Sequence, residues 1–151
     1  MLAIETDRDA YSAGDTVIAT VKLSLDKRTK ARGVYVRLVC KERKMVKTTT
    51  VMDRYDYDRD REMSVPYSSH METKTEERTK NWFEQEKKVC GEGEFVEGTY
   101  EVRFSLPKNA PPTSHEFGHD NLIHVWKISA KLDVPFAIDK NAQKEIFIEG
   151  L

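Results

Sequence analysis

Apolar and polar residues alternate along two runs in the last third of the chain. Between residues 100 and 106 apolar side chains take every second position, and between residues 122 and 134 they do so again. Because successive side chains of a strand point to opposite faces, this period of two predicts two strands with one face in a core and one in water. The side chains expected to be buried are those of Tyr100, Phe104, Trp126, Ile128 and Leu132.

The same alternation recurs in residues 17–25, 34–40 and 146–148, and it favours a β-sandwich. Residues 1–6 and 82–83 indicate further strands, whereas the polar residues 26–33 are predicted to form a loop. No segment carries a 3.6-residue apolar period long enough for a substantial helix. We therefore expect an all-β chain folded as a two-sheet antiparallel β-sandwich.

Three prolines separate the two alternating runs near the end of the chain. Pro107, Pro111 and Pro112 have no N–H group to donate to a strand ladder, which excludes a tight hairpin between the runs. We expect an extended arch that carries the chain from one sheet to the other.

Residues 47–80 interrupt this pattern because they are rich in charged residues, serine and threonine and contain few aliphatic side chains. This composition predicts a long, charged, partly mobile excursion between two strands, hairpin-like at its base and surrounded by solvent.

The residues of these last two strands, and those at the start of the chain, resemble one family of proteins. The similar positions near the end are Gly98, Tyr100, Val102, Phe104, Leu106, Pro107, Ala110, Pro111, Pro112 and Thr113, then Ile123, Trp126, Ile128, Ala130, Leu132, Asp133 and Pro135. Those near the start are Tyr11, Gly14, Asp15 and Val17. Together they resemble the arrestin-like superfamily, especially the N-terminal sandwich of arrestins and the sporulation-control-type relatives. The resemblance implies a single arrestin-like, immunoglobulin-like domain over residues 1–151 and a non-catalytic adaptor function.

Composition and charge constrain the partners and the compartment. The chain has 26 acidic and 25 basic residues and a net charge of -1, so no bulk charge favours nucleic acid. It shows no secretory signal and no apolar stretch long enough to span a bilayer, and we expect a cytoplasmic protein. Cys40 and Cys90 are too few for a disulfide framework and lack zinc-site spacing; we expect Cys40 in the core, with a Cys40–Cys90 bridge as the alternative.

His115, Glu116 and His119 match the H-E-x-x-H motif of zinc hydrolases. That motif works on a helix, because one turn aims both imidazoles at the same metal. Here prolines precede it, Gly118 interrupts it and a strand follows, so we expect a loop without a catalytic zinc centre and no cofactor. A zinc-binding site of His115 and His119, with or without His124, is the weaker alternative.

Asp56, Asp58 and Asp60 form a D-x-D-x-D run that resembles the start of a calcium-binding loop. An EF-hand loop needs glycine at its sixth position and glutamate at its twelfth, and these positions hold Arg61 and Tyr67. We expect a loop of mixed charge there and no metal site.

A concentration of basic residues is the feature that most indicates binding. Nine bases and one acid lie between residues 27 and 47. In the strand, Arg37, Lys41, Arg43 and Lys47 share the parity opposite to the apolar residues, so they should form an outward basic stripe. Arginine and lysine side chains make strong, charge-assisted hydrogen bonds to carboxylates and phosphates. The competing interpretation is a solvated strand face, balanced by neighbours such as Glu84 and Glu86.

Three functions follow from these observations. The preferred one is a non-catalytic protein–protein interaction module that binds acidic or phosphorylated segments through Arg37, Lys41, Arg43 and Lys47, with self-association through edge strands as a further option. The second is a metal-binding or metal-dependent hydrolase site built on His115, Glu116 and His119. The third is a carbohydrate-binding sandwich, although Trp126 is expected to face inward and leaves no aromatic platform. The sequence contains no glycine-rich phosphate loop, nucleophile elbow or CxxC pair.

Overall fold

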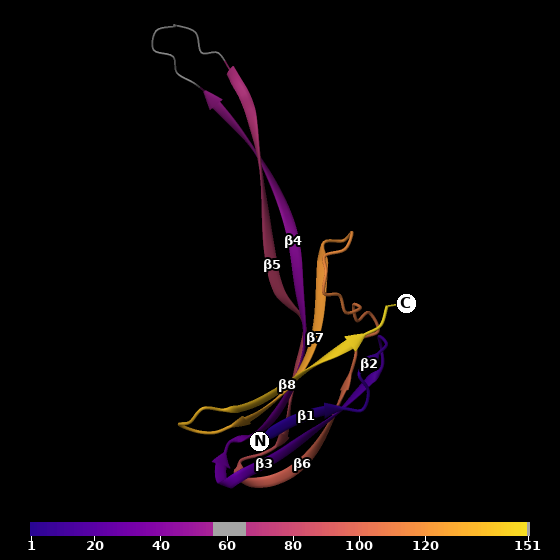
Figure 1. Cartoon of the computed structure of the whole chain (residues 1–151), viewed down its shortest axis with the longest axis vertical. Helices are drawn as coiled ribbons and strands as arrows, with labels where there is room; N and C mark the ends of the chain where they lie inside the picture. Colours follow the sequence, from indigo (N-terminus) through magenta and orange to yellow (C-terminus); the bar gives the residue numbers. More distant parts are fainter. Residues whose placement is uncertain (56–65, 151) are drawn as a thin grey trace.

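The computed structural model describes residues 1–55 and 66–150, which form eight strands and no helix (Figure 1). The strands are β1 (Leu2–Thr6), β2 (Ala10–Tyr11), β3 (Thr16–Ala31), β4 (Gly33–Tyr55), β5 (Pro66–Cys90), β6 (Gly93–Ser105), β7 (Leu122–Asp133) and β8 (Lys140–Ile148). One sheet has the order β1-β3-β6 and the other β2-β8-β7-β4-β5. Neighbouring strands are antiparallel except for the short parallel pair β2–β8. The predicted all-β, two-sheet sandwich is confirmed.

The two sheets bury one face of each alternating strand in a common core. Trp126 and Ile128 of β7 are completely buried, as are Phe104 of β6 and the alternate β4 side chains Val34, Val36, Leu38 and Cys40. Tyr100 differs from the prediction, because it is only partly buried and packs at the margin of this core. Its hydroxyl group lies close to Gly98, where a methyl group in place of hydrogen would come within 2.7 Å of it. The alternation therefore predicted which way Tyr100 points, but not how deeply it is buried.

The arch (residues 106–121) carries the chain from β6 in the first sheet to β7 in the second, as predicted. The Trp126 Nε1–H donates to the Pro111 carbonyl oxygen (3.0 Å), and the Ser114 amide donates to the His124 carbonyl oxygen (2.9 Å). These contacts hold the arch along the end of β7 and satisfy the only polar group of the buried indole. The proline-rich segment is thus part of the boundary of the core.

The predicted polar loop at residues 26–33 is wrong, because β3 continues through Ala31. Its pairing with β6 shifts register between Ser24 and Thr29 and then resumes, with Ala31 opposite Gly93. Ala31 and Phe95 are buried in this continuation. A bulge accommodates extra polar residues in one strand while pairing continues beyond it, so their polarity did not end the strand.

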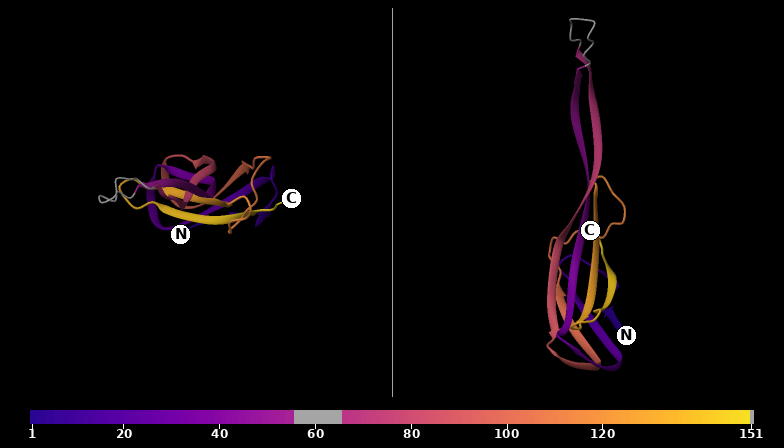
Figure 2. Two further views of the ribbon diagram at one scale, coloured as in Figure 1. Left: turned by 90° about the horizontal axis from the view of Figure 1, so that it is seen from above. Right: turned by 90° about the vertical axis from the view of Figure 1, so that its left-hand side faces the viewer.

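The hairpin predicted at the base of the charged excursion (residues 47–80) is longer than expected, since the strand pair continues to Tyr55 and Pro66, with a register shift between Met52 and Arg54. Beyond Lys44, β4 has no pairing with β7 and pairs only with β5, from Met45 opposite Glu77 to Tyr55 opposite Pro66. This hairpin arm (residues 45–55 and 66–77) extends far from the sandwich (Figures 1 and 2). The hydrogen bonds of a strand pair join backbone groups, and every residue type carries these groups, apart from the N–H that proline lacks. A charged sequence can therefore form a strand pair when solvent covers both of its faces. Asp56, Asp58 and Asp60 lie outside the described residues.

A bulge in β5 sits where the hairpin arm meets the sandwich. Cys40 lies opposite Phe83 and Lys41 opposite Asn81, so Trp82 is an extra residue in β5. The rings of Trp82 and Phe83 both approach Trp126, with centroid distances of 6.0 and 5.7 Å. The bulge therefore brings two consecutive aromatic side chains toward the core, which strict alternation would forbid. It also resets which β5 side chains point outward.

Candidate basic binding face

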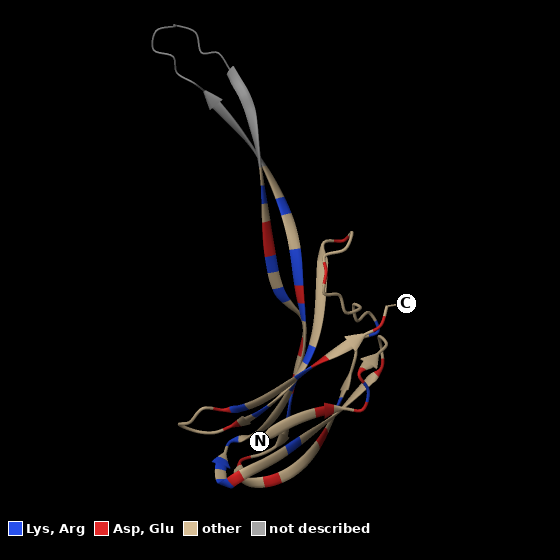
Figure 3. Cartoon of the chain, in the orientation of Figure 1, with Lys and Arg blue, Asp and Glu red and all other residues tan. Residues whose placement is uncertain are grey.

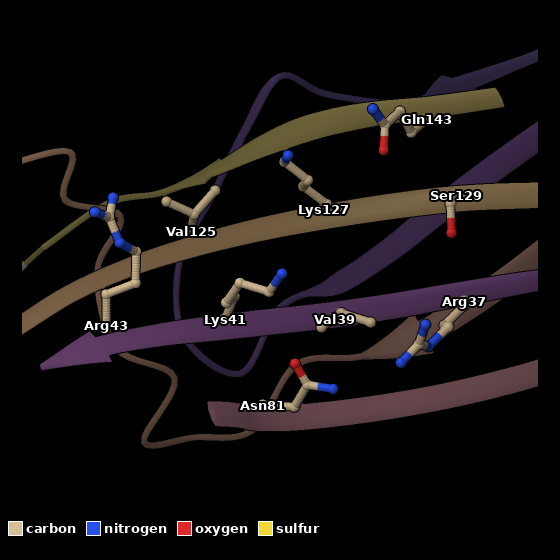
Figure 4. Close-up of a pocket in the computed structure, with 9 residues that line it drawn as sticks. All are labelled: Arg37, Val39, Lys41, Arg43, Asn81, Val125, Lys127, Ser129 and Gln143. Atoms are coloured by element: carbon tan, nitrogen blue, oxygen red, sulfur yellow. The ribbon is translucent and has the colours of Figure 1, made fainter. Parts of the chain in front are cut away.

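The outer face of the five-stranded sheet carries three of the four predicted binding residues. Arg37, Lys41 and Arg43 project from β4 on the side opposite to the buried residues, and Lys127 projects beside them from β7 (Figure 4). Lys47 does not join them, because it lies on the hairpin arm beyond Lys44, the last residue of β4 that pairs with β7. The predicted stripe is thus divided between the sheet face and the arm.

These side chains line a groove of about 440 Å³ that runs over β4 and β7. The basic groove, as we call it, is lined by Arg37, Val39, Lys41, Arg43, Asn81, Val125, Lys127, Ser129 and Gln143. Its lining includes the aliphatic side chains of Val39 and Val125, and its neutral polar groups can both donate and accept hydrogen bonds. Such a lining suits an extended chain that carries negative charge.

Both arginines of the basic groove are already paired with glutamates of β5. Arg37 Nη2 lies 2.5 Å from Glu84 Oε1, and Arg43 is hydrogen-bonded through Nε to Glu77. The hydrogen bond from Arg43 and its positive charge hold the pKa of Glu77 below its ordinary value. The Arg43 guanidinium also lies over the ring of Phe117 from the arch, 5.7 Å from its centroid. These contacts fix the position of Arg43 and offset its charge.

Lys41 and Lys127 are different, because among the described residues neither forms an ion pair. They are diagonal neighbours: Lys41 lies opposite Val125, and Lys127 lies opposite Val39. Both side chains are exposed, and Figure 4 shows them rising from adjacent strands on the same side of the sheet. The uncompensated positive charge of the basic groove therefore belongs to these two lysines.

Arg37 retains one unused donor. Its Nε atom is buried and has no hydrogen-bond partner among the described residues, although Nη2 is held by Glu84. A buried donor without a partner costs free energy, and a carboxylate that bridged Nε and Nη2 would satisfy it.

The basic character continues along β4 and β7 beyond the groove. Tyr35 lies between two lysines, with Lys88 Nζ at 5.7 Å and Lys131 Nζ at 5.8 Å from its ring centroid. A second hollow of about 150 Å³ adjoins the groove here and contains Glu86 and Asn141. Figure 3 shows basic residues (blue) and acidic residues (red) close together along the paired strands β4 and β5.

On the inner face, where the hairpin arm leaves the sandwich, a carboxylate and an imidazole are buried together. Glu42 Oε1 lies 3.1 Å from His124 Nε2, and its second oxygen lies 3.2 Å from Lys80 Nζ. Burial by itself would raise the pKa of Glu42, but the hydrogen bonds and positive charges of Lys80 and His124 outweigh it and lower the pKa. His124 is thus a side chain at the margin of the core with a local partner, as its parity predicted.

The H-E-x-x-H residues lie on the arch in bends and turns, without a helix. His115 Nε2 lies 2.5 Å from Glu145 Oε1 of β8, and His119 is exposed on the adjoining turn. Across the described ranges, 1–55 and 66–150, no three His, Cys, Asp or Glu side chains are grouped as metal ligands would be. The two histidines therefore do not share the helical face that a zinc hydrolase uses.

The two cysteines do not form the alternative bridge. Both are free thiols: Cys40 is buried, and Cys90 is partly exposed opposite Val34, six residues away along β4. Burial, together with the nearby Glu42 carboxylate, raises the pKa of the Cys40 thiol to about 12. Cys40 is therefore an unreactive core residue.

Sequence reasoning missed Lys127, Ser129 and Gln143 as neighbours of the predicted basic residues. Lys127 and Ser129 alternate with Trp126 and Ile128, which were expected in the core, so the pattern indicated their outward direction; Gln143 lies in β8 and carried no such signal. What the pattern lacked was strand order, because only the pairing of β4 with β7 and β7 with β8 brings these residues to Arg37 and Lys41.

Comparison with known proteins agrees with this architecture. The two-sheet topology and the arch define an all-β sandwich. The family model of the arrestin (or S-antigen) N-terminal domain matches residues 1–149. The chain therefore belongs to the arrestin N-terminal domain family, whose fold is in general that of non-catalytic adaptors.

A solved structure supports the same fold. The sporulation control protein Spo0M from Bacillus subtilis superimposes with a TM-score of 0.57 at 20% sequence identity, over 99% of this chain and 49% of Spo0M. This chain thus spans about half the length of that protein. No curated protein matches the sequence. Within the described part of the chain there is no helix of the length and hydrophobicity that a membrane span requires.

Proposed function

We propose that this domain is a non-catalytic adaptor module that binds an acidic or phosphorylated segment of a partner protein in the basic groove. The observation that carries the proposal is the pair Lys41 and Lys127, two exposed lysines without an ion pair among the described residues. Their charges are free to be compensated by a ligand, whereas the Arg37 and Arg43 charges are already balanced within the domain.

The spacing of the groove matches that of an extended peptide. Residues two apart on one face of a strand repeat at about 6.6–6.8 Å, and the same repeat holds for an extended ligand laid along β4. Acidic side chains at alternate ligand positions would therefore meet successive basic positions of the groove. Asn81, Ser129 and Gln143 supply neutral hydrogen bonds to the intervening groups.

The direct test compares two synthetic peptides that differ only in charge, a phosphoserine-rich one and its unphosphorylated form. Fluorescence anisotropy with the wild-type domain should show binding only of the phosphorylated peptide, weakening as salt rises because exposed charges are screened. Charge reversal in Lys41→Glu/Lys127→Glu should weaken this binding by roughly tenfold or more and remove its salt dependence. Folding should be nearly unchanged, since both side chains are exposed.

The matched control is Lys22→Glu/Lys108→Glu, which makes the same change of charge at two exposed positions outside the groove. It should bind the phosphorylated peptide almost as well as the wild type. Equal losses in the two double variants would mean that only net charge matters. Wild-type affinity in Lys41→Glu/Lys127→Glu at low salt would exclude the groove as the binding site.

A further inference from the structure

The loop that joins β7 and β8 exposes two large apolar side chains to solvent. Compared with 75% for Met1, 46% for Phe147 and 39% for Val96, the relative exposure is 106% for Phe136 and 93% for Ile138. They lie two positions apart at the end of the β7–β8 hairpin, which projects from the side of the sandwich (Figure 1). We call this pair the apolar tip.

The backbone holds the apolar tip outward at a conformational cost. Phe136 has φ of 59°, a left-handed conformation that is uncommon for an aromatic residue. The loop is closed by a hydrogen bond from the Val134 amide to Asp139 Oδ1 (3.0 Å), and Pro135 restricts the intervening backbone. Strained conformations of this kind persist where the surrounding structure enforces them, and they are concentrated at functional sites.

Basic residues surround the base of the hairpin. Lys131 and Lys140 flank the loop, and the Arg32 amide is hydrogen-bonded to the Asp133 carbonyl oxygen (2.8 Å). Arg32 follows the end of β3, which carries three more bases, Lys27, Arg28 and Lys30. Figure 3 shows these basic residues of β3 gathered at the same end of the sandwich as the β7–β8 hairpin.

The acidic residues of this end are partly engaged within the protein. Asp139 accepts the Val134 amide and lies 3.9 Å from Lys131, and Glu94 lies 3.7 Å from Arg28. This end of the molecule therefore presents an apolar projection beside residues of both charges, of which Lys27, Lys30 and Lys140 form no ion pair among the described residues.

We propose that the apolar tip inserts into the interfacial region of an anionic lipid surface, with the basic residues around it contacting the headgroups. A bilayer interface can accept a small convex projection, whereas a stable protein interface needs a broad complementary surface of about 1,000 Å² or more. Cations near the tip would meet negatively charged headgroups when the apolar side chains enter the acyl boundary. This role does not depend on the basic groove, and it would add a membrane contact to the adaptor function.

Co-sedimentation with lipid vesicles tests the proposal. The wild-type domain should bind vesicles of phosphatidylcholine and phosphatidylserine more tightly than vesicles of phosphatidylcholine alone. Phe136→Ser/Ile138→Ser should weaken binding to the mixed vesicles by about tenfold or more, because binding scales with the apolar area that enters the interface. The control is Phe147→Ser, which removes a less exposed apolar side chain from β8, away from the loop and from the basic end of β3. It should bind like the wild type.

Insertion has a separate spectroscopic readout. In Phe136→Trp, lipids brominated in their acyl chains should quench the added fluorescence, beyond any quenching of the wild-type domain that contains Trp82 and Trp126. Absence of vesicle binding at low salt, or binding without this added quenching, would overturn the proposal. A wild-type dimer in sedimentation velocity that becomes monomeric in Phe136→Ser/Ile138→Ser would also overturn it, by showing that the tip contacts a second copy. A failure of the phosphopeptide test would leave these results unaffected.

Discussion

Two kinds of single residue contribute to the stability of this domain. The first are glycines that leave room for a neighbouring strand, and the second are ionised side chains with buried partners. Gly33, at the start of β4, shows the first kind. A methyl group at this position would lie 2.7 Å from the Cys90 carbonyl oxygen and 2.9 Å from Lys88 Cε. The Lys88 side chain can move, but the carbonyl oxygen belongs to the β5 backbone, so the strands would have to separate.

Gly33→Ala should therefore destabilise the domain by about 1–3 kcal/mol, the usual cost of forcing extra volume into a packed site. Urea denaturation measures this change. Gly93→Ala provides a matched control, because a methyl group there meets no atom within 4 Å. It should be neutral or stabilise the fold slightly by restricting the unfolded chain. Equal stability of the two variants would show that the β4–β5 junction is not closely packed.

Glu42 shows the second kind of position. Its folded-state pKa is below the ordinary value, because the Lys80 and His124 contacts outweigh the effect of burial. A depressed carboxylate pKa contributes stability that is complete above the unfolded-state pKa of about 4.3 and is lost as the pH falls through the lower, folded-state pKa. The pair should therefore stabilise the domain at neutral pH and stop doing so in acid.

Glu42→Gln should cost about 1.5–3 kcal/mol of stability at pH 7, the range for a hydrogen bond to a charged group. The free energies of unfolding of the variant and the wild type should converge as the pH falls below about 4. The control Glu5→Gln removes an exposed carboxylate paired with Lys22 and should change stability by well under 1 kcal/mol at either pH. If Glu42→Gln were still less stable than the wild type at acid pH, the difference in stability would come from packing and not from the charge of Glu42.

At the scale of elements, the two strands of the hairpin arm pair, over their described residues, with each other and with no other strand of the sandwich. Past Lys44 the described residues of β4 pair only with β5, so the arm adds a long ladder but no further sheet neighbour. The bulge at Trp82 lies at the boundary and packs its aromatic ring against Trp126. Core packing therefore ends close to where the arm begins.

Replacing residues 47–75 by an Asn-Gly turn between Val46 and Glu76 should leave a folded sandwich, because these two residues are register partners and Asn-Gly favours a tight hairpin. Circular dichroism should retain a β-sheet spectrum with cooperative unfolding. Phosphopeptide affinity should also be retained, since the deletion removes Lys47 but no residue that lines the basic groove. Loss of binding in a folded variant would place the acidic ligand on the hairpin arm.

At the scale of the whole molecule, the two proposed contact surfaces lie at separate places on the same sandwich. The basic groove lies over the middle of β4 and β7, and the apolar tip lies where β7 turns into β8. Tyr35 and its two flanking lysines lie between them. A domain arranged in this way could hold an acidic segment of a protein while it rests on a lipid surface.

The sequence by itself determined the strands and the direction of most of their side chains. Alternation is a local property, so it was enough to assign Trp126 and Ile128 to the core and Arg37, Lys41 and Arg43 to the opposite face. It also located the arch, because proline removes a backbone donor wherever it occurs.

Only the tertiary structure decided how far the strands extend and which charges remain free. The continuation of β3 to Ala31 and the ladder of the hairpin arm depend on a partner strand distant in sequence, and the local polarity of those segments suggested loops. Glu84 and Glu77 neutralise Arg37 and Arg43 across strand pairs, whereas Lys41 and Lys127 meet only through the pairing of β4 with β7. Strand order and register are long-range properties, and the binding capacity of a sheet face depends on them because they determine which side chains are neighbours.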